Sequence, residues 1–145
     1  MRPAIVIVAI AVASCASDGP RDEHRRFSIQ AALEKGDSYR TKIEFGVSLF
    51  FGDEKTPRVA KRMATFSANT KSNLVGKSSQ EACDIAFISA LADLQQRARR
   101  EGGDAVINIR SVYRGENSAS RSEYVCGTGT IMVGVTLEGT VVKLK

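Results

Sequence analysis

Residues Ser78–Tyr113 read SSQEACDIAFISALADLQQRARREGGDAVINIRSVY, and this stretch decides the fold class. Its first part carries apolar and small residues at spacings of three and four, which places them on one face of a helix. They are Cys83, Phe87, Ala90, Leu91, Leu94 and Ala98. Its last part is rich in β-branched residues and predicts a strand over 105–113. The sequence therefore predicts a helix from Ser79 to about Arg100 that packs on a sheet.

The start of this helix carries a capping box, Ser78-x-x-Glu81. The Ser78 hydroxyl accepts a hydrogen bond from the amide three residues on, and the Glu81 carboxylate reaches back to the Ser78 amide. The preceding Gly76-Lys77 completes Gly-Lys-Ser, the end of a phosphate-binding P-loop. Lys71 stands where that motif requires its first glycine, and the segment before Gly76 is polar rather than a buried strand. We interpret Ser78 and Glu81 as a helix cap and expect no bound nucleotide.

The end of the helix is basic. Arg97, Arg99 and Arg100 precede two glycines, and the C-terminus of a helix favours both cations and glycine. The same arginines, together with Arg110 and Arg114 further along, are candidates for contact with a polyanion such as peptidoglycan or lipopolysaccharide. Both interpretations are consistent with the sequence.

Further elements are predicted on either side of this stretch. Apolar and polar residues alternate over 43–51, a second strand is predicted over 60–68, and a short helix over 27–36. Strand also extends over 124–144, with Gly139 marking a bulge or turn. The residues of this run that alternate on one face are Ile131, Val133, Val135 and Leu137.

The predicted elements define an α+β fold. We expect one long helix packed on a mostly antiparallel sheet, in a small single domain over residues 27–145. The chain of 145 residues suits one such domain.

The first residues have the order of an export signal. Arg2 is followed by an uninterrupted run of Ala, Ile and Val over 4–13 and then by small residues. This run is too short to span a bilayer as a helix, which takes about 20 residues. A buried N-terminal strand or short helix is the alternative. We predict a signal peptide over residues 1–14.

The end of that run, Val12-Ala13-Ser14-Cys15, resembles the lipobox of bacterial lipoproteins. The resemblance implies cleavage before Cys15, diacylglycerol on its sulfur and acylation of the new amine, and several acyl chains anchor a protein stably. In the sorting pattern known for enteric bacteria, Ala16 in the second mature position favours the outer membrane. Residues 15–26 are predicted to be the lipidated cysteine and a flexible polar tether.

The number of cysteines fits an exported protein. Of the three, Cys15 is assigned to lipid, which leaves Cys83 and Cys126 as an even pair in an oxidising compartment. Cys83 lies on the helix stripe that faces the sheet, so we predict a disulfide between the two; a pair of unrelated buried thiols is the alternative. Two cysteines and one distant histidine form no ligand cluster, so no metal is expected.

The sequence contains no evident catalytic group. Its single histidine, His24, falls in the predicted tether, so a Ser-His-Asp arrangement is not expected. The formal net charge of +5 permits contact with anionic lipid or cell-wall polymer without requiring nucleic acid. We expect no enzyme, no cofactor and no nucleic-acid partner.

Two blocks carry a family resemblance: GKSSQEACDIAFISALADLQQRARREGGDAVINIRSVYRG and SEYVCGTGTIMVGVTLEGTVVKL. With FFGDEKTP and TFSANTKSN, they are similar to small bacterial lipoproteins that often carry the name "excinuclease ATPase subunit", over about residues 46–144. Such a subunit needs complete P-loops and zinc modules, which this sequence lacks. The helix leading into GGDAVINIRS and the final GTVVKL strand more distantly resemble the domain of the lipoprotein that senses envelope stress in the Rcs pathway, which is likewise disulfide-bonded and tethered.

The sequence therefore predicts a lipid-anchored, non-enzymatic protein of the bacterial envelope, facing the periplasm from the outer membrane. It would act through protein contacts, in envelope integrity or stress sensing, with an envelope protein or cell-wall polymer as partner. The alternative is a polyanion-binding module that uses the arginines of the helix end. A nucleotide-binding protein, as the family name suggests, is a third hypothesis.

Overall fold

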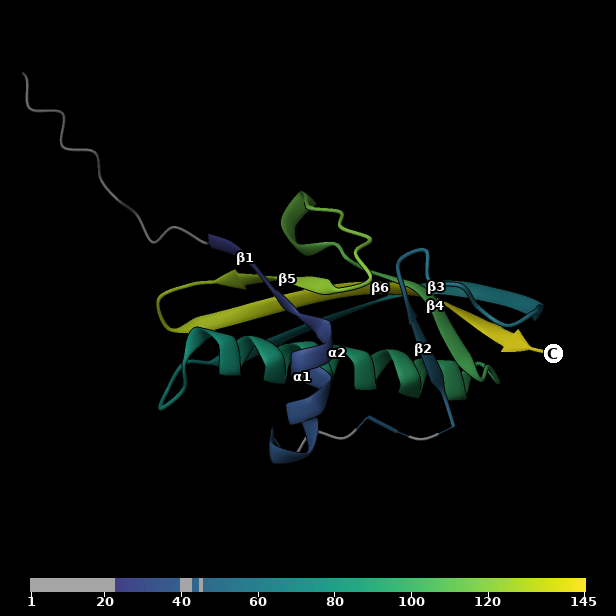
Figure 1. The fold of residues 1–145 in the computed structure, drawn as a ribbon, viewed down its shortest axis with the longest axis horizontal. Helices are drawn as coiled ribbons and strands as arrows, with labels where there is room; N and C mark the ends of the chain where they lie inside the picture. Colours follow the sequence, from purple (N-terminus) through teal and green to yellow (C-terminus); the bar gives the residue numbers. More distant parts are fainter. Residues whose placement is uncertain (1–22, 40–42, 45) are drawn as a thin grey trace, which may run out of the picture.

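A computed structural model describes residues 23–39, 43–44 and 46–145. The predicted signal peptide, Cys15 and the first part of the predicted tether lie outside the described residues. The described chain forms one mixed sheet of six strands with two α-helices on one side of it (Figure 1). The elements are β1 (Glu23–Ser28), α1 (Ile29–Lys35), η1 (Gly36–Tyr39), β2 (Ser48–Phe51), β3 (Val59–Asn73), α2 (Ser79–Arg100), β4 (Ala105–Ser111), η2 (Tyr113–Gly115), β5 (Glu123–Thr128) and β6 (Met132–Leu144).

Strand β6 joins the sheet together. β3 pairs antiparallel with it along nearly its whole length, from Met132 to Leu144. On its other edge, the first part of β6 pairs with β5 and the later part with β4, both antiparallel. β1 then pairs antiparallel with β5, and β2 pairs parallel with β4. The sheet is therefore mixed: its pairings are mostly antiparallel, as expected, but β2 with β4 is parallel.

Helix α2 runs along one face of this sheet, and the segment that contains η2 lies on the opposite side (Figure 1). We call the two sides the inner face, which α2 covers, and the outer face. All six residues of the predicted stripe are buried, together with Val133, Val135 and Leu137 of β6. The inner face therefore holds the main core, as the apolar periodicity predicts.

The buried surface of α2 is wider than the predicted stripe. α1 and η1 contact α2, so residues beside the stripe are also enclosed, among them Ile88 and Gln95. The Gln95 amide donates to the carbonyl oxygens of Glu44 (3.0 Å) and Val47 (2.9 Å) and accepts from the Glu44 amide (2.8 Å). The expected layer of one long helix is therefore corrected to two helices, and the second, α1, lies within the short helix predicted over 27–36.

Several predicted boundaries change because of pairing partners far away in the sequence. β1 begins at Glu23 and pairs with β5, so residues 23–26 are a strand and not part of a tether. The predicted strand over 43–51 shortens to Ser48–Phe51, and that over 60–68 lengthens to Val59–Asn73 against β6. The predicted run over 124–144 is two strands, and Ile131 lies in the turn between them.

Gly139 does not interrupt β6, which continues to Leu144. The irregularity lies opposite it on β4, where Ile107 pairs with Thr140 and Arg110 with Glu138. One extra β4 residue is thereby accommodated, and Asn108 adopts a positive φ of 53°. A bulge is present near the predicted place, but the neighbouring strand carries it.

Candidate functional site

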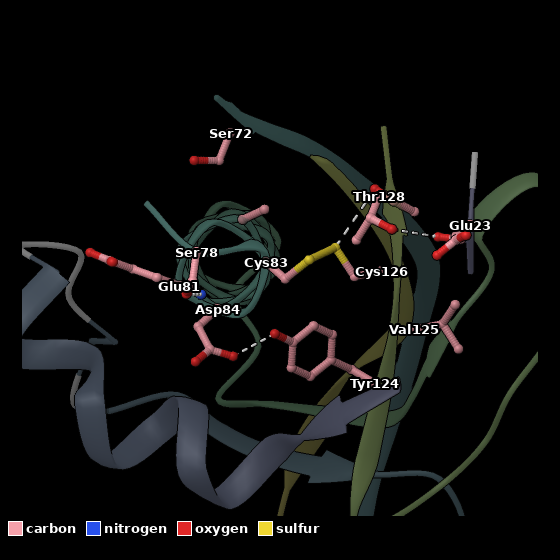
Figure 2. The surroundings of a disulfide bond; sticks show 12 residues. Glu23, Ser72, Ser78, Glu81, Cys83, Asp84, Tyr124, Val125, Cys126 and Thr128 are labelled. Atoms are coloured by element: carbon pink, nitrogen blue, oxygen red, sulfur yellow. Dashed lines mark hydrogen bonds between the residues drawn. A yellow bond between two sulfur atoms is a disulfide. The ribbon is translucent and has the colours of Figure 1, made fainter. Parts of the chain in front are cut away.

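The disulfide predicted between Cys83 and Cys126 is confirmed. The two sulfur atoms are 2.12 Å apart and link α2 to β5 across the inner face, 43 residues apart in the sequence (Figure 2). Both cysteines have no exposed surface. External thiols and oxidants therefore cannot reach the bond in the folded protein, and its role is structural.

A buried carboxyl group lies next to this disulfide. Asp84 has no exposed surface, and its Oδ1 accepts a hydrogen bond of 2.5 Å from the hydroxyl of Tyr124 (Figure 2). The Tyr39 hydroxyl lies 3.4 Å from Oδ2. Burial raises the pKa of the Asp84 carboxyl above its ordinary value, although the hydrogen bond from Tyr124 acts in the opposite direction. Burial, followed by the bond to Asp84, also raises the pKa of Tyr124.

This Asp84–Tyr124 pair belongs to the core. The Tyr124 ring stacks on that of Phe87, with centroids 4.1 Å apart and an interplanar angle of 6°. Because Asp84 and Tyr124 are enclosed, no substrate can meet them without unfolding. This pair was not predicted from the sequence. An acidic residue that directly follows a stripe residue of a helix was its only local signal.

The predicted cap of α2 is confirmed at Ser78, whose hydroxyl accepts from the Glu81 amide at 3.1 Å. The Lys77 ammonium donates to the side-chain oxygen of Asn73 at 3.1 Å. The strand that precedes the Gly76-Lys77 loop is β3, which runs antiparallel to β6. A P-loop follows a strand of a parallel sheet, so this loop has a different context and serves as a helix entry.

The five arginines predicted as one polyanion patch lie in separate places. Arg97 and Arg100 border a groove between α2 and β3. Arg99 points to the other flank of α2, where its guanidinium forms a 2.6 Å ion pair with Glu44. Arg110 donates to Asn108 and Asn117, and Arg114 lies over the Tyr113 ring, 5.4 Å from its centroid.

The last two arginines belong to the outer face. Tyr113 packs against Gly127 of β5 and Gly134 of β6. The neighbours of these glycines along the strands, Cys126, Val133 and Val135, point into the core of the inner face, so Tyr113 lies on the outer face. The structure therefore brings together only Arg97 and Arg100 of the predicted set. A continuous patch of all five is excluded, because the sheet separates the two groups.

The groove beside Arg97 and Arg100 is the candidate binding site. It has a volume of about 260 Å³ and follows the edge of β3 along the second half of α2. The Arg97 guanidinium lies over the ring of Phe66, 4.4 Å from its centroid, which holds the charge at the groove. The groove is lined by Phe66, Ser67, Ala68, Asn69, Asp93, Leu94, Gln96, Arg97 and Arg100.

The edge of β3 that does not pair with β6 adds backbone groups to this groove. Among the described residues, β3 pairs with β6 alone, so its other edge presents unpaired amides and carbonyls. The strand is 15 residues long and contains Lys61, Arg62 and Lys71 but no acidic residue. The combination of a free strand edge with an adjacent helix and a positive charge favours an extended, acidic segment as ligand.

His24 corrects another expectation, because it lies in β1 and not in a tether. Its Nδ1 is 2.7 Å from the Glu116 carboxylate, which also accepts from Arg26 at 2.8 Å. The His24 ring meets Tyr113 edge to face, with centroids 5.3 Å apart. These residues fasten the η2 segment over the outer face of β1 and β5. His24 is therefore an ordered histidine, and the absence of enzymatic activity stays a prediction.

The described residues hold no evident metal centre and no membrane-spanning helix. No group of three or more His, Cys, Asp or Glu side chains in this part of the chain is placed to hold a metal ion. Neither of its α-helices has the length and apolar character needed to cross a bilayer. Comparison of the whole chain with family models, curated proteins and solved structures found no match in any of the three.

Proposed function

We propose that this chain is a lipid-anchored, non-enzymatic protein of the bacterial envelope that acts by binding another protein, in envelope integrity or stress sensing. The observation that carries the binding function is the free edge of β3 beside the groove of Arg97 and Arg100. The lipobox-like Val12–Cys15 supports the anchor. The disulfide supports an oxidising compartment, because such bonds are rare in the cytosol.

The binding mode follows from the geometry of the edge. An extended segment of the partner would pair with the backbone of β3 and continue the sheet by one strand. Every second side chain of that segment would then point toward α2 and enter the groove. An acidic side chain at this point would meet Arg97 and Arg100, whereas Asp93 would disfavour an acid placed one helical turn earlier.

A polyanion is the second candidate ligand, supported by the positive charge around the free edge of β3. β3 carries Lys61 and Arg62 near its start and no acid, and Arg97 and Arg100 line the adjoining groove, whereas Lys71 lies on the outer face. A cell-wall polymer or lipopolysaccharide would be held mainly by charge, so its binding would fall steeply with salt. A paired strand would depend on backbone hydrogen bonds and would resist salt better.

Capture from envelope fractions tests the proposal. Immobilised protein is incubated with these fractions at about 0.05 and about 0.5 M salt. The double substitution Arg97→Glu/Arg100→Glu reverses the charge of the groove, and Arg110→Glu/Arg121→Glu changes the net charge equally at two positions that do not line it. We expect the control variant to retain a partner protein at high salt. The amount captured by the groove variant should be lower by about tenfold or more.

Other outcomes would reject parts of the proposal. Equal capture by both variants would exclude the groove as the contact. Capture of cell-wall polymer or lipopolysaccharide alone, lost at high salt, would establish the alternative ligand. The anchor is tested separately by the intact mass of the protein from its native membrane fraction. Loss of residues 1–14 and an added acyl mass on Cys15 are expected, and a full-length unlipidated chain would overturn the anchor.

A further inference from the structure

One end of the molecule exposes an unusual set of apolar side chains. Val75 is 82% exposed, Ile131 73% and Met132 43%. Among the described residues only one other large apolar side chain, Leu33 on α1, is classed as exposed, at 37%. We call Val75, Ile131 and Met132 the apolar tip. Single exposed apolar residues are ordinary on a protein surface, but a contiguous group marks an interaction site.

The fold holds the apolar tip together by backbone hydrogen bonds. The Leu74 amide donates to the Ile131 carbonyl at 3.0 Å, which joins the loop before α2 to the turn between β5 and β6. Asn73 pairs with Met132 in the sheet, and the Gly129 amide donates to the Met132 carbonyl at 2.9 Å. The side chain of Asn73 also accepts from the Val75 amide at 3.1 Å. The three apolar side chains are therefore displayed on an ordered surface.

The chain enters the domain at this same end. Glu23, the first described residue, pairs with Thr128, and Thr128 pairs with Val133 of β6. Since neighbouring strands lie about 4.8 Å apart, Glu23 is roughly 10 Å from β6 near the apolar tip. Figure 1 shows the start of β1 at the end where the β5–β6 turn and the loop into α2 also lie.

The distance to the proposed anchor is short. Cys15 precedes Glu23 by eight peptide steps, which reach at most roughly 28 Å when fully extended. A lipid on Cys15 would therefore keep this end of the domain close to the bilayer surface. The opposite end of the domain, where β4 begins and β6 ends, would face away.

Cationic side chains flank the apolar tip. Lys71 and Met132 line the same hollow on the outer face, and Lys77 lies in the loop that carries Val75. Two acidic residues lie at the same end, Glu23 opposite Thr128 and Glu81 in the first turn of α2. Apolar side chains beside lysines suit the boundary between acyl chains and anionic headgroups, where the ammonium groups remain in water.

We infer that the apolar tip docks against the lipid bilayer, with Val75 and Ile131 inserted at the boundary between headgroups and acyl chains. This inference rests on the proposed lipid anchor for its orientation. Docking would fix the domain with the start of β1 at the membrane. The free edge of β3 would then extend away from the lipid surface, where an extended partner segment can reach it.

Tryptophan fluorescence tests this contact directly, since the chain contains no Trp. Val75→Trp, Ile131→Trp and, as the matched control, Leu33→Trp each introduce one fluorophore at an exposed apolar position. The chain from residue 15 onward with Cys15→Ser keeps every described element and carries no lipid. It is added to vesicles of phosphatidylethanolamine and phosphatidylglycerol whose acyl chains are brominated. We expect a blue shift and quenching at positions 75 and 131, and neither at position 33.

A charge substitution supplies the second measurement. Ile131→Asp is expected to lower vesicle partitioning about tenfold, whereas Leu33→Asp should change it less than about twofold. Equal melting temperatures would show that both variants remain folded. Absence of quenching at 75 and 131, or equal quenching at 33, would overturn the inference. The two proposals can also fail separately. If the unlipidated chain docks on vesicles but the native protein carries no acyl mass, the anchor is rejected and the membrane contact of the apolar tip is retained.

Discussion

The inner and outer faces of the sheet are built in different ways. On the inner face, α2 covers the sheet with side chains that recur every three or four residues, and the Cys83–Cys126 bond joins the two layers. On the outer face, the η2 segment is fastened by His24, Arg26 and Glu116, whose hydrogen bonds span about 90 residues of sequence. The inner face depends on burial, and the outer face on specific polar pairs and on glycines.

This difference shows where substitutions should matter most. Removing a core contact or a cross-link on the inner face loses burial or loop closure, which are large terms in stability. Polar pairs on the outer face are partly exposed, so each contributes little. The outer face should be sensitive mainly where its packing is tight, as at Gly127 beneath Tyr113.

The largest effect is expected from removal of the disulfide. Cys83→Ala/Cys126→Ala opens a loop of 43 residues and should lower the free energy of unfolding by about 4 kcal/mol. Urea unfolding followed by circular dichroism measures the change, and Cys15→Ala, outside the described fold, is the control. A loss of no more than the control shows would contradict the view that this bond holds the inner face together.

A smaller effect is expected at Gly127 on the outer face. A Cβ at this position would lie 2.1 Å from Cε1 of Tyr113, so Gly127→Ala must displace the ring or the strand. We expect a loss of about 1–3 kcal/mol in the free energy of unfolding. In the Tyr113→Ala background the same substitution should cost much less, because the obstructing ring is gone. An equal cost in both backgrounds would exclude Tyr113 as the cause.

The smallest expected effect is on the pH dependence of stability. It shows whether Asp84 is buried as a charged carboxylate or as a neutral hydrogen-bonding group. The pKa of Asp84 is raised in the folded protein, so the folded state binds its proton more tightly than the unfolded state does. Its contribution to stability is therefore greatest below the ordinary carboxyl pKa and decreases as pH rises through the raised value. Asp84→Asn keeps an acceptor for Tyr124 and removes this dependence.

Urea unfolding between about pH 4 and 8 measures the difference between Asp84→Asn and the unmodified chain. We expect that difference to grow in favour of Asp84→Asn with rising pH. Asp53→Asn serves as control, because its exposed carboxyl has a pKa lowered by Arg121, so the sign of its pH dependence is opposite. A difference for Asp84→Asn that stays constant with pH would show that this carboxyl does not titrate in the range.

The two faces also differ in how far they follow from the sequence. Apolar periodicity predicted α2 and its buried stripe, because this signal is local in the sequence. The disulfide could be predicted because only two cysteines remain beside Cys15, and one of them lies on the stripe. β1 was missed because EHRRFS is polar and is a strand only through its pairing with β5. The length of β3 likewise comes from β6, since the polar segment before Asn73 has no strong strand propensity of its own.

The candidate site was predicted only in part. The basic end of α2 indicated Arg97 and Arg100. Spacing along a helix could not show that Arg99 forms an ion pair with Glu44 on the other flank. Arg110 and Arg114 were grouped with them because they are near in sequence, although the sheet lies between. The contribution of β3 could not be predicted, because a free edge is a property of the whole pairing order.

The central place of β6 has a consequence for how the chain is made. β3, β4 and β5 all precede it in the sequence, so the strand that they share is the last of the six to be synthesised. In a chain that emerges from a ribosome, β1 can pair with β5 and β2 with β4, but these two pairs and β3 cannot join into one sheet until β6 follows. Because most of its pairings are distant in sequence, folding of the whole sheet should be slow and should be completed only once β6 has emerged. If the chain is exported as proposed, the late position of β6 would keep the sheet incomplete while the chain crosses the membrane.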